Sequence, residues 1–256
     1  MIVDKKTSKK ITLLIFSIFF LVGLSTFKDY GISIDEEHHR YAGFYWLSYI
    51  LSFTSFDELK SIVAIKLESV KGFTLPLPED HPYYGALFDV PVAFLEVIFQ
   101  INDSKNIFYF KHFFNFTFFF VGSIFFYKLL LNRFSNYKIS IFGTLFFILS
   151  PRIYASGFFN MKDIVFLSLA IISIYYCFKY WDKRNYKNLL IFSIFAALST
   201  SHRILGIFIP GSFIIFYLLS ALSNKKDLNY ISHIILFFIF YIFFTILFWP
   251  YLWSDP

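Results

Sequence analysis

Helix-length apolar runs constrain this chain more than any other feature. They lie at residues 11–27, 107–131, 138–155, 162–181, 187–202, 204–222 and 230–252. Several approach the roughly 20 residues that a helix needs to cross the hydrocarbon core of a bilayer. The sequence therefore predicts an all-α, polytopic membrane protein with about seven transmembrane helices.

The composition agrees with lipid as the solvent. Hydrophobic residues make up 57% of the chain and charged residues only 16%, which excludes an ordinary soluble domain. The net charge of +6 does not indicate a nucleic-acid partner, because the basic residues crowd the ends of the apolar runs, where they act as topology determinants. The first run has no small-residue cleavage site after it and is interpreted as a retained anchor.

The basic residues predict the orientation. If seven spans alternate, one face collects the N-terminal lysines together with Lys128, Arg133, Lys138, Lys179, Lys183, Arg184, Lys187, Lys225 and Lys226. Positively charged short loops stay in the cytoplasm, so the N-terminus is predicted to be cytoplasmic. The long loop at 28–106 is then extracytoplasmic, and it carries twelve of the seventeen acidic residues.

That long loop is not predicted to be a separate soluble domain, and the chain 1–256 is treated as one transmembrane domain. Two stretches, Tyr41–Phe56 and Ala86–Ile101, are apolar or aromatic and predict a pair of amphipathic helices in the membrane interface. Counting Leu87–Ile101 as a further span would place the later basic loops outside, so that alternative is rejected. The residues 75–85 between the two stretches are rich in proline and read as a loop.

Polar candidates for a functional site gather at the extracytoplasmic ends of the predicted spans. They are Asp35, Glu36, His81, Lys111, His112, Arg152, Lys162, Asp163, His202 and Arg203. Because a charge at mid-membrane costs about 2.5–3.5 kcal/mol, segments that keep such residues near their ends are expected to surround a wet cavity or an anionic headgroup. A carboxylate there can take a proton from an acceptor while cations hold a phosphate leaving group. Transfer from a lipid-linked phosphosugar meets both needs.

The order of these pieces resembles the GT-C superfamily of polyprenyl-phosphate-sugar transferases, which includes the protein O-mannosyltransferases and the lipid A aminoarabinose transferase. The matching features are Asp35-Glu36 after the first span, the long first outer loop, His81-Pro82-Tyr83-Tyr84-Gly85, Lys111-His112, Ser150-Pro151-Arg152, Asn160-Met161-Lys162-Asp163 and Ser201-His202-Arg203. Aminoarabinose transferases carry Lys-Pro where this chain has His81-Pro82. Family members also commonly run to twice this length, so the chain is expected to be the N-terminal part of the usual family length.

The resemblance implies an inverting glycosyltransferase of the bacterial inner membrane that acts on the extracytoplasmic face. Asp35 would be the catalytic base and Glu36 would support it, while Asp163 would orient the substrate. Donor phosphate would contact cations among Arg152, Lys162, His202 and Arg203. The implied partners are a polyprenyl-phosphate-sugar donor, a lipid, glycan or protein acceptor, and membrane lipids; no cofactor and no metal is implied.

Several simpler interpretations stay open. The carboxylates at 35–37 can cap a helix N-terminus, Lys162 and Asp163 can form a local ion pair, and the arginines can extend to lipid headgroups. His38 and His39 invite a metal site, but adjacent residues on a helix point in different directions; Asp89 and Glu96 are interpreted as helix-face residues. The alternative functions are a transporter or flippase component for lipid-linked glycans and a non-catalytic remnant. The ionisable residues gather at one face rather than at the midplane that transporters use, which favours the enzyme.

Overall fold

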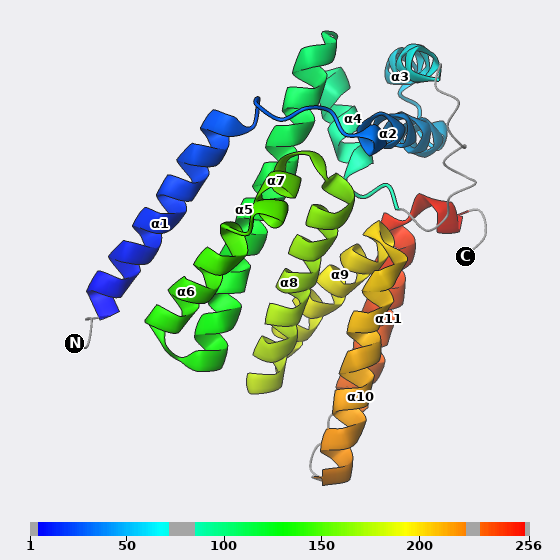
Figure 1. The fold of residues 1–256 in the computed structure, drawn as a ribbon. Coiled ribbons are helices and arrows are strands. Elements are labelled where there is room, and N and C mark those ends of the chain that lie inside the picture. Colours follow the sequence, from blue (N-terminus) through cyan, green and yellow to red (C-terminus); the bar gives the residue numbers. More distant parts are fainter. Residues whose placement is uncertain (1–4, 72–84, 224–230, 254–256) are drawn as a thin grey trace.

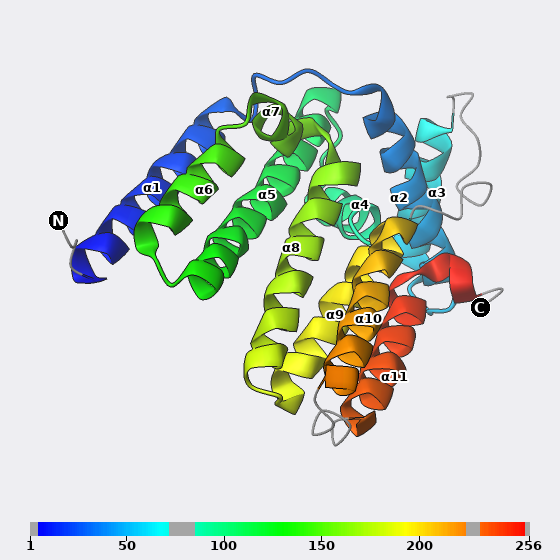
Figure 2. The ribbon, with the colours of Figure 1, turned by 60° about the horizontal axis from the view of Figure 1, so that its bottom comes forward.

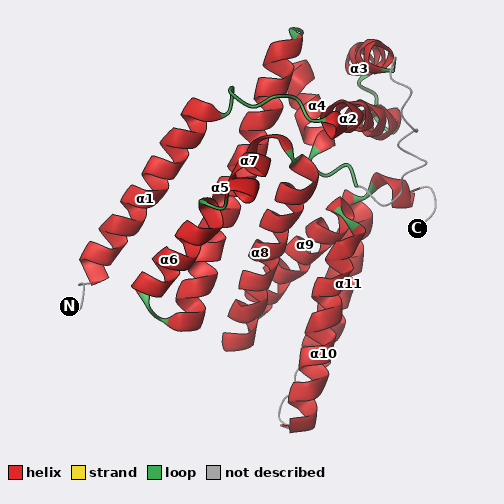
Figure 3. Cartoon of the chain, viewed as in Figure 1, coloured by secondary structure: helices red, strands yellow, loops and turns green. Residues whose placement is uncertain are grey.

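A computed structural model describes residues 5–71, 85–223 and 231–253 of the chain. These residues form helices and turns, and none of them lies in a strand (Figure 3). The predicted all-α class is confirmed.

Five helical stretches among the described residues are long and apolar enough to cross a membrane. They are α1 (Lys5–Thr26), α5 (Ser104–Phe134), α8 (Met161–Asp182), the 3₁₀ turn η2 (Ile204–Ile207) continued by α10 (Phe208–Ser223), and α11 (Ile231–Phe248). Each coincides with a predicted apolar run to within a few residues. Figures 1 and 2 show these helices side by side, with α1 at one edge and α10 with α11 at the other.

The run predicted at 138–155 is broken. It forms α6 (Tyr137–Ile148) and α7 (Pro151–Phe159), whose axes meet at 62°. Pro151 lies in the first turn of α7, and the preceding Ser150 has an extended backbone with ψ 117°. Proline disfavours the helical conformation in the residue before it, so the break falls at this pair. Counted as one unit, α6 and α7 raise the candidate spans to six.

The count of seven predicted spans is not reached in the described residues. The run at 187–202 forms α9 (Tyr186–His202), which has 17 residues and so measures about 25 Å, slightly less than the roughly 30 Å hydrocarbon core. Arg203 ends α9 with an extended backbone, and η2 begins immediately after it. α9 packs between α8 and α11, and its buried face includes Ser193, Ser199, Thr200 and Ser201.

The long loop folds over one end of the bundle as three helices rather than the two predicted. They are α2 (Ile34–Ser52), α3 (Asp57–Val70) and α4 (Asp89–Ile98), which gather beyond the end of the bundle opposite the start of α1 (Figure 1). α3 was missed because most of its surface is polar; only Val63 and Val70 are buried, and they pack against α2. With 10 residues, α4 measures about 15 Å and is too short to cross a bilayer.

The three loop helices share an apolar core of their own. Side chains from α2, α3 and α4 interlock there, namely Tyr41, Phe44, Leu47, Leu51, Val63, Val70, Ala93 and Val97. A short 3₁₀ turn after α11, η4 (Pro250–Trp253), adds aromatic contacts to α2, with Tyr251 against Trp46 and Trp253 against Tyr49. The loop helices are thereby fixed over the bundle end to which all the described candidate residues belong.

Candidate functional site

The start of α2 is attached to the end of α7. The Ser33 hydroxyl donates to the Phe159 carbonyl at 3.4 Å, and the Tyr30 ring stacks on Phe158 with centroids 4.3 Å apart. Phe159 lies one residue before Asn160, the N-cap of α8. These contacts bring the acidic first turn of α2 to the junction that carries Lys162 and Asp163, which are more than 120 residues away in the chain.

Asp35 and Glu36 have different environments although they are adjacent. Asp35 is exposed in the first turn of α2, whereas Glu36 is fully buried. Oε2 of Glu36 accepts the backbone N–H of Ser33 at 2.7 Å, which satisfies one of the donors that a helix start leaves free. The capping interpretation therefore holds for Glu36, while the Asp35 carboxylate remains open to solvent.

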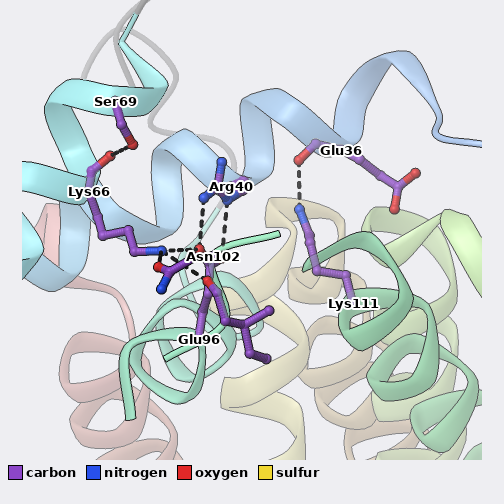
Figure 4. Close-up of polar contacts among 8 residues, drawn as sticks. Glu36, Arg40, Lys66, Ser69, Glu96, Asn102 and Lys111 are labelled. Atoms are coloured by element: carbon purple, nitrogen blue, oxygen red, sulfur yellow. Dashed lines mark hydrogen bonds and ion pairs between the residues drawn. The ribbon is translucent and has the colours of Figure 1, made fainter. Parts of the chain in front are cut away.

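Lys111 and His112 lie under this turn and bind the main chain above them. The Lys111 ammonium donates to the Glu36 carbonyl at 2.6 Å (Figure 4), and Nδ1 of His112 lies 3.2 Å from the Phe27 carbonyl. Nε2 of His112 faces Oε1 of Glu36 at 3.0 Å without the alignment of a hydrogen bond. Both side chains are almost fully buried, so the structure uses them to hold residues 27–36 in place.

A second buried pair joins α2 to α4. Nδ1 of His39 lies 2.8 Å from Oδ2 of Asp89, and both residues are buried. The helices approach closely at Gly43, where a Cβ atom would lie 2.6 Å from the Asp89 carbonyl oxygen. Burial opposes ionisation of Asp89, but the charge and hydrogen bond of His39 together with Lys111 and His202 outweigh it and lower the pKa of the carboxyl group.

The sequence alone does not predict His39 and Asp89 as a pair. Asp89 was interpreted as a helix-face residue, and His39 was considered only beside His38. The available signal was the position of Asp89 at the start of an otherwise apolar helix, since a buried carboxylate requires a partner. The sequence does not reveal which residue that partner is, because His39 and Asp89 are 50 positions apart in the chain.

An ion-pair network ties the loop helices together below α2. The Arg40 guanidinium binds both oxygens of Glu96, at 3.1 and 2.7 Å, and Glu96 is buried. The Lys66 ammonium from α3 approaches Glu96 at 3.4 Å and donates to the Ile101 carbonyl and the Asn102 side chain (Figure 4). Glu96 is thus a helix-face residue with two cationic neighbours, Arg40 and Lys66.

The remaining candidates lie where α7, α8 and α9 end or begin. Asp163 is exposed and forms an ion pair with Arg203, and Asn160 caps α8 by accepting the Asp163 backbone N–H at 3.0 Å. His202 is buried, and its Nε2 lies 3.2 Å from the Met161 carbonyl. Arg152 is exposed in the first turn of α7, and Lys162 is half-buried.

His81 lies outside the described residues. The chain is described again from Gly85, whose N–H donates to the His202 carbonyl at 3.4 Å. A Cβ atom on residue 85 would lie 1.4 Å from the Ser201 carbonyl oxygen, so only glycine fits there. Gly85 therefore lies against the end of α9.

The described candidates form two neighbouring groups at one bundle end. Asp35, Glu36, Lys111 and His112 surround the start of α2, and Lys162, Asp163, His202 and Arg203 surround the start of α8. The Ser33–Phe159 contact connects the groups. Within the described ranges, no three His, Cys, Asp or Glu side chains converge as a metal site would require. The exposed carboxylate of Asp35, with the exposed Arg152 and the half-buried Lys162 and Arg203 on neighbouring elements, suits acid–base chemistry on an anionic substrate.

Comparison with known families identifies the chain more directly. The model of the dolichyl-phosphate-mannose-protein mannosyltransferase family matches residues 90–249. Neither the curated proteins nor the solved structures contain a match to this chain. The matched region contains Lys111, His112 and the candidates from Arg152 to Arg203, while Asp35, Glu36 and His81 precede it. Because that region is more than half of the chain, the protein belongs to the dolichyl-phosphate-mannose-protein mannosyltransferase family and is a membrane glycosyltransferase of the GT-C type.

Proposed function

We propose that this protein transfers a sugar from a polyprenyl-phosphate-linked donor to a lipid, glycan or protein acceptor with inversion at the anomeric carbon. The acceptor oxygen or nitrogen attacks that carbon while the bond to the phosphate oxygen breaks, and the phosphate keeps the electron pair. The acceptor proton passes to Asp35. A carboxylate in this role contributes about 10²–10⁴ in rate.

The observation that carries this proposal is the difference in exposure between two adjacent carboxylates. Asp35 is exposed at the start of α2, where a substrate can reach it. Glu36 is fully buried and accepts a bond from the Ser33 N–H, so it cannot touch an acceptor. Glu36 supports the reaction by fixing the turn that presents Asp35, which agrees with the supporting role that the resemblance implies.

Cations for the leaving phosphate are available on the neighbouring elements. Arg152 is exposed on α7, and Lys162 lies at the start of α8, beside the attachment of α2 to Phe159. Arg203 is oriented by its ion pair with Asp163. Charge-assisted bonds from such groups stabilise the negative charge that develops on phosphate. His81 stays a candidate for the same ligand on the resemblance alone.

We further propose that the site faces the extracytoplasmic side of a bacterial inner membrane. The basic turns that follow α5 and α8 lie at the bundle end opposite α2 (Figure 1). Basic short loops stay cytoplasmic, which leaves the carboxylates and their neighbouring cations on the outer face.

The test is transfer of radiolabelled sugar from a polyprenyl-phosphate-sugar pool to endogenous acceptors in membranes that contain this chain. The Asp35→Asn variant should lose transfer by about 10²-fold or more, with unchanged membrane insertion. Glu37→Gln is the matched control, since it removes a carboxylate from the same turn, and it should keep transfer. Activity retained by Asp35→Asn would exclude Asp35 as the base. Absence of transfer by the unaltered chain would overturn the proposed function.

A further inference from the structure

The proposed reaction leaves one buried pair unused. His39 and Asp89 come from two helices, lie 2.8 Å apart, and have side chains that are 8% and 4% exposed. The second carboxylate oxygen of Asp89, Oδ1, is buried without a hydrogen-bond partner among the described residues. Burying two ionisable groups costs free energy that a purely apolar contact between α2 and α4 would not, so the pair calls for a functional account.

His39 lies one helical turn after Asp35. Residues four apart on a helix are neighbours, with about 5–6 Å between their Cβ atoms. Helical side chains also tilt toward the N-terminus, so the His39 ring leans toward the turn that carries Asp35. The 2.8 Å contact with Asp89 involves Nδ1, which leaves Nε2 on the other side of the ring.

The contact with Asp89 determines which tautomer a neutral His39 ring adopts. An ionised Asp89 accepts a hydrogen bond from the Nδ1–H group, so the neutral ring carries its lone pair on Nε2. That nitrogen can accept a proton, and the resulting imidazolium is stabilised by the carboxylate against Nδ1. The arrangement is that of an imidazole base oriented by a buried acid.

We propose that His39, oriented by Asp89, receives the proton that Asp35 takes from the acceptor. The inference rests on the proposed function. In this step, which passes through one water because the two side chains make no direct contact, the O–H bond of the Asp35 carboxylic acid breaks and an N–H bond forms at Nε2 of His39. Asp35 returns to the carboxylate and His39 becomes the imidazolium, with no change in oxidation state. The proton later leaves Nε2 for water, which restores both groups for another turnover.

The neighbouring charges limit how long His39 keeps the proton. Lys111 from α5 and His202 from α9 both lie within electrostatic reach of the pair. A cation at Lys111 disfavours the imidazolium, while Asp89 favours it.

His112, the other histidine beside α2, does not fit this role. Its Nδ1 faces the Phe27 carbonyl and its Nε2 lies 3.0 Å from Oε1 of Glu36, so neither nitrogen is directed at Asp35. Its side chain is only 1% exposed. His39 is therefore the imidazole to test.

The first test measures the coupling of the two groups without any transfer assay. The full chain, labelled with ¹⁵N in its histidine rings and held in nanodiscs, is titrated by nuclear magnetic resonance, and His39→Gln assigns the His39 signal. Removing a nearby negative charge destabilises the imidazolium, so Asp35→Asn should lower the titration midpoint of His39 by about 0.5 pH unit or more. Glu37→Gln is the control, because residues two apart do not face each other on a helix, and it should shift the midpoint less.

The second test measures transfer against pH. In the unaltered protein the rate should fall at acid pH. His39→Gln should lower turnover by about 10²-fold and move this acid limb to lower pH, because only protonation of the Asp35 base then limits the rate. Asp89→Asn should act in the same direction, and His38→Gln, one residue away, should leave rate and profile unchanged. An unchanged acid limb in His39→Gln would overturn the proposal.

The two tests separate failure of the relay from failure of the proposed function. An unmoved His39 midpoint in Asp35→Asn overturns the relay whatever the transfer assay gives. A moved midpoint in a protein without transfer supports the coupling and overturns the proposed function instead.

Discussion

Asp89 stays ionised although its neighbours in the chain, Phe88 and Val90, are apolar. The cations around it cause this, since they more than offset the cost of burying the carboxylate and leave its pKa below the ordinary value. A carboxyl group whose pKa is lower in the folded state contributes stability above the pKa of the unfolded chain, near 3.9, and that stability is lost as the pH falls through the folded pKa. The contribution of Asp89 should therefore be complete at neutral pH.

Asp89→Asn tests this at the residue scale. The variant keeps the size of the side chain and loses the charge against His39, so at pH 7 it should be less stable to unfolding by about 1.5–3 kcal/mol. The difference from the unaltered protein should narrow only below about pH 4. Thermal unfolding in detergent micelles from pH 3 to 8 measures both quantities. A gap that is constant over this range would show that the charge of Asp89 does not stabilise the fold.

Single residues also show which parts of the candidate site could be predicted from the sequence and which could not. Asp35, Lys162 and Arg203 were recognisable because each is a charge at the edge of an apolar run, and hydropathy reports such edges directly. The partners of Glu36 and Asp89 were not recognisable, because His112 and His39 are distant from them in the chain. Their pairing depends on how α2 lies across α4 and α5. No local pattern in a single sequence encodes that arrangement.

At the scale of elements, the Arg40–Glu96 contact joins α2 to α4, with the Arg40 side chain 18% and the Glu96 side chain 2% exposed. Removing one partner of a buried pair costs about 3–5 kcal/mol, and loss of Arg40 should cost less than that because Lys66 still lies 3.4 Å from Glu96. Arg40→Met should therefore loosen the three loop helices together, since Lys66 of α3 also approaches Glu96. Hydrogen exchange across α2, α3 and α4 should speed up in this variant, and the unfolding temperature in micelles should fall.

The matched control is an ion pair on α3, another of the three loop helices. Lys60 and Asp57 form an ion pair at 3.4 Å in which the Asp57 side chain is 89% exposed, and exposed pairs contribute little. Lys60→Met should leave exchange and unfolding temperature nearly unchanged. Equal effects of Arg40→Met and Lys60→Met would show that burial of the Arg40–Glu96 pair does not matter to the loop helices.

The elements themselves were predictable in proportion to their hydrophobicity. α1, α5, α8 and α11 follow their apolar runs closely because apolar length is what lets a helix span lipid. α3 was missed since its 14 residues mix apolar side chains with Asp, Glu, Lys and Ser, and only Val63 and Val70 are buried. The break at Pro151 has a local cause, yet the mainly apolar composition of residues 138–155 concealed it.

For the whole molecule, the decisive property is the separation of its two ends. Asp35, Arg152, Asp163 and Arg203 belong to one end, and the basic turns after α5 and α8 belong to the other, so the orientation in the membrane determines which compartment supplies the substrates. The same separation depends on α9 returning the chain to the first end. With 17 residues, α9 is the element whose crossing most needs a direct measurement.

Single-cysteine labelling measures both the orientation and the crossing. Cys177→Ser removes the chain's one thiol, and cysteines are then introduced at Ile34, which is 91% exposed, at Lys183 in the turn before α9, and at Leu205 after it. Positive-inside orientation predicts that a membrane-impermeant maleimide labels Ile34→Cys and Leu205→Cys in intact spheroplasts, and Lys183→Cys only after permeabilisation. The reverse pattern would place the carboxylates in the cytoplasm. Labelling of Leu205→Cys together with Lys183→Cys would show that α9 does not cross the membrane. The Asp163–Arg203 pair joins α8 to the end of α9, and it would then face a different compartment from the one proposed.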